Sequence, residues 1–194
     1  MTSAEVAAWV QAVGSIVAIA AAGMFPKWHN DALQAGKILL YSRLAARLID
    51  RMSHLRRLVS NDLQLENQGD REIEISQGIG WLETYCETFE KIRPMDIPDG
   101  RLIAPLERCQ TVSKEAHDAM QRYIGLMGGD PSFRGQGVSE ELAKKHAPDA
   151  AVKLLGHFIT AAQADLRVIE KVRRAFLTGP RYWLLGRPSL DRET

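Results

Sequence analysis

The segment Val6–Phe25 reads V-A-A-W-V-Q-A-V-G-S-I-V-A-I-A-A-A-G-M-F and contains no charged residue. A helix of these twenty residues would be about 30 Å long, which matches the hydrocarbon layer of a bilayer. Its strongly apolar residues are diluted by alanine, so the insertion free energy is only about −2 to −4 kcal/mol. The sequence therefore predicts a single transmembrane helix within residues 1–28.

Two other interpretations of this segment compete with a membrane anchor. A helix buried inside a soluble fold would also be rich in alanine. Gln11 is polar and makes insertion into a bilayer less favourable. A cleaved secretory signal would need a basic start, but Met1–Glu5 contains only an acidic side chain. The anchor remains the favoured interpretation.

The flanking residues predict the orientation of the span. Lys27, Lys37 and Arg43 follow it and no basic residue precedes it, so the N-terminus should lie outside and the bulk of the chain in the cytoplasm. Trp9 and Trp28 lie near its two ends, where amphipathic rings favour the interface.

Small residues recur along one face of the predicted span. Gly14, Ala18 and Ala22 are four residues apart, and this spacing would let a second membrane helix approach closely. The pattern predicts a homo-oligomer or a protein partner, although an alanine-rich helix also produces such a stripe by chance.

The remaining 166 residues predict an all-α domain. Apolar residues recur every three or four positions in four stretches, which we place at about 31–60, 75–93, 102–127 and 148–178, with a short turn at Ser139–Glu141. Four such helices fit an antiparallel four-helix bundle over residues 29–179. Met127 and both cysteines, Cys86 and Cys109, fall on predicted inward faces.

The charge pattern suggests a basic surface on the first soluble helix. The net charge is +1, but Arg43, Arg47 and Arg51 form a row on the first soluble helix that could contact phosphates of lipid or nucleic acid. A solvated face is the simpler explanation of this row.

The segment 180–194 is a basic and aromatic tail that includes Arg181, Trp183 and Arg187. An up-and-down bundle would return the end of its fourth helix to the bilayer, where these residues could touch lipid. Alternatively, the aromatic residues of the tail cap the bundle.

Motifs for catalysis or ligand binding are not found. The glycine-rich stretch Gly128–Gly137 follows no strand and lacks Gly-Lys-Ser/Thr, so it reads as a connection between helices. The five histidines occur in neither H-E-x-x-H nor Glu-x-x-His spacing. We therefore assign no catalytic residue, cofactor or metal, and the sequence leans away from an enzyme.

The stretch Trp9–Ala20, W-V-Q-A-V-G-S-I-V-A-I-A, resembles the leader segments of small bacterial and prophage-encoded membrane-anchored proteins. The resemblance implies a bacterial inner-membrane context and a phage-related or defence-related role. Together with the bundle, it predicts an interaction or regulatory module. The alternative is a nucleic-acid-binding protein at the cytoplasmic face that uses the arginine row.

Overall fold

The computed structural model describes residues 3–60, 68–128, 132 and 139–178, and every long element among them is helical. The elements are α1 (Ser3–Val59), α2 (Gln68–Glu90), the short 3₁₀ helices η1 (Pro94–Asp96) and η2 (Gly100–Leu102), α3 (Ile103–Met127) and α4 (Glu140–Thr178). The prediction of an all-α chain is confirmed.

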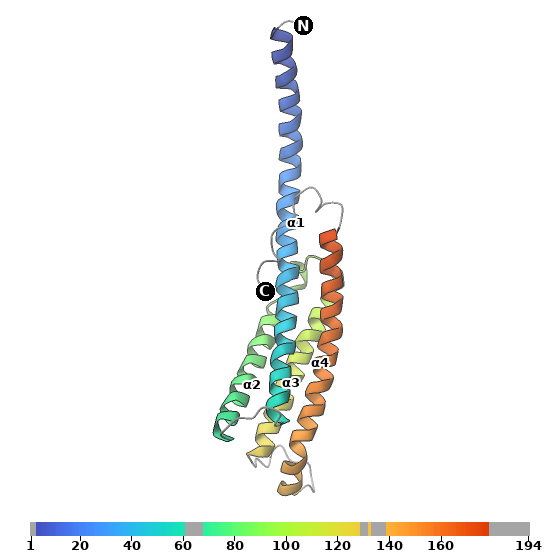
Figure 1. The fold of residues 1–194 in the computed structure, drawn as a ribbon. Helices are drawn as coiled ribbons and strands as arrows, with labels where there is room; N and C mark the ends of the chain where they lie inside the picture. Colours follow the sequence, from blue (N-terminus) through green and yellow to red (C-terminus); the bar gives the residue numbers. More distant parts are fainter. Residues whose placement is uncertain (1–2, 61–67, 129–131, 133–138, 179–194) are drawn as a thin grey trace.

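Successive helices run in opposite directions and pack side by side (Figure 1). α1 packs against α2 and α4, and α3 closes the bundle by packing against the same two helices. The N-terminal half of α1 stands out alone from one end of the bundle, and α4 ends on that same side (Figure 1). The predicted antiparallel four-helix bundle is confirmed.

α1 is a single helix of 57 residues, which corresponds to a length of about 85 Å. We predicted that the first bundle helix would begin near Asp31, separate from the apolar segment. Instead, the expected boundary at residue 28 lies inside α1. Both stretches favour helix, and a lone proline such as Pro26 removes one backbone hydrogen bond without having to end the helix.

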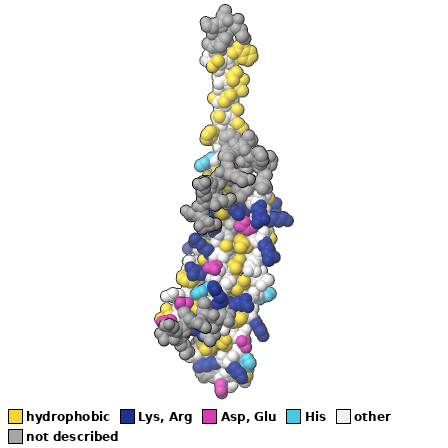
Figure 2. Space-filling view, in the orientation of Figure 1, with side chains coloured by type: hydrophobic (Ala, Val, Ile, Leu, Met, Phe, Trp, Pro, Cys, Tyr) yellow, Lys and Arg dark blue, Asp and Glu magenta, His cyan; other side chains and the backbone are white. Residues whose placement is uncertain are grey.

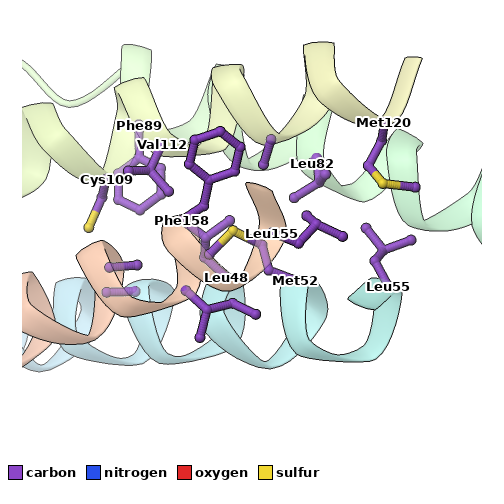
Figure 3. Packing of buried hydrophobic residues seen from close by; sticks show 14 of the residues in the cluster. Leu48, Met52, Leu55, Leu82, Phe89, Cys109, Val112, Met120, Leu155 and Phe158 are labelled. Carbon is purple, nitrogen blue, oxygen red and sulfur yellow. The ribbon is translucent and has the colours of Figure 1, made fainter. Parts of the chain in front are cut away.

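The core fills the space between the four helices (Figure 3). Leu48, Met52 and Leu55 of α1 are at most 1% exposed and face the interior of the bundle. The other helices supply buried side chains to the same cluster, among them Leu82, Phe89, Cys109, Val112, Met120, Leu155 and Phe158. The prediction that Met127 points inward was wrong, because this side chain is 41% exposed. Met127 is the last residue of α3 and lies at the end of the bundle.

Two helix starts differ from the prediction. α2 begins at Gln68 and not near Ile75, and α4 begins at Glu140 and not at Pro148. Pro148 lies inside α4, where it cannot donate the usual backbone hydrogen bond. Ala147 and Ala151 on either side of it are buried, so packing against the core holds this part of α4 in place.

Gly78 of α2 is required by the close approach of α1. A Cβ atom at this position would lie 2.9 Å from Leu55 Cγ, closer than carbon atoms pack, and the Leu55 side chain is itself buried. Gly80 lies two residues later, and a Cβ atom added there would meet nothing within 4 Å. The two glycines of α2 therefore differ in role: Gly78 permits helix packing, whereas Gly80 only weakens the helix.

We predict opposite effects of alanine at these two glycines. Gly78→Ala should lower the free energy of unfolding by about 1–3 kcal/mol through overpacking against Leu55. Gly80→Ala should raise it by roughly 0.5–1 kcal/mol because alanine favours helix. Thermal unfolding followed by circular dichroism in detergent measures both. Two variants that shift the midpoint in the same direction would contradict the assigned close approach.

Candidate membrane interface

The protruding half of α1 carries an apolar surface that nothing in the described chain covers. Its large hydrophobic side chains are between 45% and 73% exposed, namely Trp9, Val10, Val13, Ile16, Val17, Ile19, Met24 and Phe25. Figure 2 shows these side chains as a yellow stem above the bundle. Leaving them in water would cost on the order of 10 kcal/mol. By length and composition, this segment is a candidate membrane span or signal sequence.

The backbone groups and the Ser15 hydroxyl of this apolar segment form hydrogen bonds within the helix. The helical backbone is continuous, which pairs its N–H and C=O groups without help from water. Ser15 Oγ donates a hydrogen bond of 2.8 Å to the carbonyl oxygen of Gln11, one turn earlier. These features meet the physical requirement for crossing a hydrocarbon layer.

The predicted small-residue stripe lies on this exposed segment. Gly14, Ala18 and Ala22 are all exposed, and a Cβ atom added at Gly14 would meet nothing within 4 Å. The fold of a single chain leaves the stripe open, and pairing through it stays a prediction.

The three arginines of the row on α1 lie in different environments. Arg43 and Arg47 are exposed, whereas the guanidinium carbon of Arg51 lies 3.7 Å from the centre of the Trp81 ring in α2. Arg51 therefore makes a cation–π contact that holds α1 and α2 together. Only the first two arginines of the row point into solvent without this aromatic contact.

The remaining sequence-predicted sites fall outside the described residues. These are the tail residues Arg181, Trp183 and Arg187, and most of the stretch Gly128–Gly137. Within that stretch Gly128 is the exposed C-cap of α3, and its N–H donates to the carbonyl oxygen of Ile124.

An ion pair with a buried carboxylate, which the sequence analysis missed, joins α3 and α4. Asp165 is 3% exposed although it lies on the apolar stripe of α4. Arg108 Nε and Nη2 donate to Asp165 Oδ1 over 2.8 and 2.5 Å. The hydrogen bond to Asp165 raises the pKa of Arg108. The sequence signal for this pair was an acidic residue between the inward positions Ala162 and Ile169. Its partner Arg108 is 57 residues away and could not be identified from the sequence.

Cys109 follows Arg108 and is fully buried in the core. Burial, and then the negative charge of Asp165, raise the pKa of the Cys109 thiol to about 12. A thiol with that pKa stays protonated at neutral pH and does not act as a nucleophile. Cys86 is partly exposed, so the two free cysteines lie in different environments.

A shallow groove runs between α3 and α4 in the half of the bundle remote from the protruding helix. Its volume is about 380 Å³. Its floor is apolar and includes Tyr123 and Phe158, and its rim carries Glu115, Asp118 and Arg122. Its lining contains no cysteine, serine or histidine that could act as a nucleophile or base. Across the described chain, no group of three or more His, Cys, Asp or Glu side chains could hold a metal ion.

Comparison with known proteins adds no family. The chain matches no protein-family model, no curated protein and no solved structure.

Replacing either partner of the Arg108–Asp165 pair should lower stability, but by different amounts. Arg108→Gln should lower the free energy of unfolding by about 2–3 kcal/mol, because it leaves a buried carboxylate without its cation. Asp165→Asn should cost only about 1 kcal/mol, because the half-exposed Arg108 side chain can turn toward water. Urea unfolding of both variants tests this order, and the reverse order would exclude a paired, buried carboxylate.

Alkylation should distinguish the two cysteines. In the folded protein, iodoacetamide at pH 8 should modify Cys86 and spare Cys109, since the Cys109 thiol is buried and protonated. In urea both should react. Peptide mass spectrometry after a timed reaction reads out each site, and equal labelling of the folded protein would contradict the buried position of Cys109.

Proposed function

We propose that this chain is a single-pass protein of a bacterial inner membrane, with its N-terminus outside and its helical bundle in the cytoplasm as an interaction or regulatory module. One observation carries the proposal: from Trp9 to Phe25, α1 is uncharged and exposes its large hydrophobic side chains, and it then continues without a break into the bundle core. A helix with this change of pattern suits a chain that leaves a bilayer and enters a folded domain.

One feature favours a retained anchor over a cleaved signal. Cleavage after Phe25 would cut inside α1, whose second half supplies Leu48, Met52 and Leu55 to the core. An intact α1 instead connects the bundle to the span as one continuous helix.

The regulatory part of the proposal rests on this continuous helical connection. α2 holds the far end of α1, because Arg71 Nε donates to the carbonyl oxygen of Leu58 over 2.7 Å and Arg71 Nη2 to that of Val59 over 3.1 Å. A partner bound to the bundle would therefore act on the same helix that crosses the membrane. A tilt or rotation of the span would be passed to the bundle in the same way.

Nucleic-acid binding through the arginine row is the second candidate. Exposed Arg43 and Arg47 favour it, whereas Arg51 is already engaged by Trp81. Binding to phosphates would weaken steeply with added salt, and Arg43→Ala and Arg47→Ala would reduce the salt slope by about one unit each. Binding of DNA or RNA that does not respond to salt or to these changes would argue against this candidate.

The membrane topology is directly testable. The full-length protein should sediment with bacterial membranes and resist carbonate extraction, because the apolar stem is buried in lipid. A reporter that is active only in the cytoplasm should be active when it is fused after Thr194. The intact mass of the protein should include the apolar segment. A cytosolic full-length protein, or a mature chain that begins after Phe25, would refute the anchor.

A further inference from the structure

A basic surface extends from α1 onto α4, which packs beside it. It consists of six exposed Lys and Arg side chains on the two helices: Arg43, Arg47 and Arg57 of α1, and Lys153, Arg167 and Lys171 of α4. Figure 2 shows dark-blue side chains along the side of the bundle where α4 lies beside α1. We call these six residues the two-helix basic face.

Each helix presents its three cations on one side. Arg57 follows Arg43 by fourteen residues, and Arg167 follows Lys153 by the same interval, which is close to four helical turns. Arg47 and Lys171 each lie one turn further along, four residues after Arg43 and Arg167. The buried side chains lie on the other side of both helices, so the two rows of cations point away from the core.

One close approach between α1 and α4 fixes how the two rows are aligned. A Cβ atom built at Gly156 would lie 3.8 Å from Cζ of Arg56, so these two residues are at the same level. The helices are antiparallel, as Figure 1 shows. Measured upward from this level, Arg47 lies about 14 Å and Arg167 about 17 Å away along the helix axes. Each helix therefore contributes a cation at nearly the same height.

The same alignment holds at the two ends of the face. Arg43 lies about 20 Å and Lys171 about 23 Å above the level of Gly156, whereas Arg57 and Lys153 lie within about 5 Å of it. The face thus has three levels over about 27 Å, each with one cation from α1 and one from α4. Packed helix axes are about 8–10 Å apart, which sets the separation of the two rows.

Within the described part of the chain, none of these six cations forms an ion pair. Other basic residues do, among them Arg101, Arg108 and Arg173. The acidic neighbours Asp50 and Asp149 are exposed and are not paired with the face either. Like charges brought together in this way repel. An anion from outside the chain would relieve that repulsion, so the face suits a negatively charged partner.

The dimensions favour a polyanion over a single phosphate. A lone phosphate group would meet the cations of one level, whereas a duplex carries one negative charge per about 1.7 Å of its axis. Along the length of the face it would present about 16 phosphates. Two parallel rows of cations can therefore contact several phosphates at once.

The side chains around the cations favour a nucleic-acid duplex over lipid or a single strand. The exposed large hydrophobic residues of α4 in this range are Leu154 and Val168. Leu154 lines the groove next to α3, and Val168 follows it by about four turns, so both lie on a different side of α4. Interfacial membrane binding needs apolar side chains beside the cations, and single strands need aromatic side chains on which bases stack. The two-helix basic face has neither.

We propose that the two-helix basic face binds the phosphate backbone of a nucleic-acid duplex, with α1 and α4 both contacting phosphates. The proposal rests on nucleic-acid binding, the second candidate above, and extends it from the arginine row of α1 to three cations of α4. It does not depend on the membrane anchor. Contacts to phosphates carry no direct sequence information, so binding should be independent of base sequence.

Duplex binding by the full-length protein in uncharged detergent micelles tests the proposal. Fluorescence anisotropy with a labelled DNA duplex of about 20 base pairs should show an affinity that falls about 10³-fold between about 50 and 200 mM salt. The double variant Arg167→Glu/Lys171→Glu should weaken binding at least tenfold at low salt. It should also reduce the salt slope by about two units, because two phosphate contacts are lost.

Two matched variants separate position from charge and from folding. Lys114→Glu/Arg122→Glu makes the same change of charge at two exposed residues of α3, outside the face, and should keep the affinity within about twofold. Arg167→Lys/Lys171→Arg keeps the positive charge and should bind like the unchanged protein. Circular dichroism of each variant checks that the helix content is retained.

The outcomes distinguish this proposal from the candidate on which it rests. If Arg43→Ala and Arg47→Ala weaken binding but the α4 variant behaves like the α3 control, the arginine row binds alone and the two-helix face is wrong. If the unchanged protein does not bind the duplex at low salt, both fail. If the α4 variant instead loses binding to vesicles that contain phosphatidylglycerol, while the duplex is not bound, the partner is lipid and the proposal is overturned.

Discussion

The structure depends on one constraint: an α-helix satisfies its backbone hydrogen bonds within itself, so the same helix can lie in a bilayer, in water or in a protein core. α1 uses this property over 57 residues. Only its side-chain pattern changes along the way. Where the pattern becomes one-sided, α2, α3 and α4 pack against it, and where it is apolar all round, α1 stands alone (Figure 1).

Specific contacts with α2 help to hold the bundle part of α1 in place. Gly78 lets α2 approach the buried Leu55, and Arg51 of α1 stacks on Trp81 of α2. At the end of α1, Arg71 donates to two terminal carbonyl groups and places its positive charge at the negative end of the helix dipole. The C-terminal end of α1 is thus held by α2. In the described chain, no other helix packs against its N-terminal part.

α3 and α4 are joined by a different kind of contact. The carboxylate of Asp165 is buried, and Arg108 reaches it from the adjacent helix. A buried charge is tolerated only with such a partner, so this pair restricts which helix faces can meet. Cys109 lies in the core beside this pair, where burial first and the negative charge of Asp165 second raise the pKa of its thiol.

Periodicity is a local property, and it carried the predictions that were confirmed. The apolar repeats of the four stretches at about 31–60, 75–93, 102–127 and 148–178 were enough to predict an all-α chain, an antiparallel bundle and most of its inward side chains. The uncharged segment was enough to predict a helix with the length and composition of a membrane span. None of these features requires knowledge of which helices become neighbours.

Helix boundaries and cross-helix partners could not be obtained in the same way. The start of α4 at Glu140 depends on buried Ala147 and Ala151, whose contacts outweigh the tendency of Pro148 to begin a helix. The partners of Arg51 and Asp165 are 30 and 57 residues away. Sequence alone therefore determined which stretches are helical and which of their faces are apolar, because these follow from neighbouring residues. Only the tertiary structure decided which faces meet, because that depends on the packing of all four helices at once.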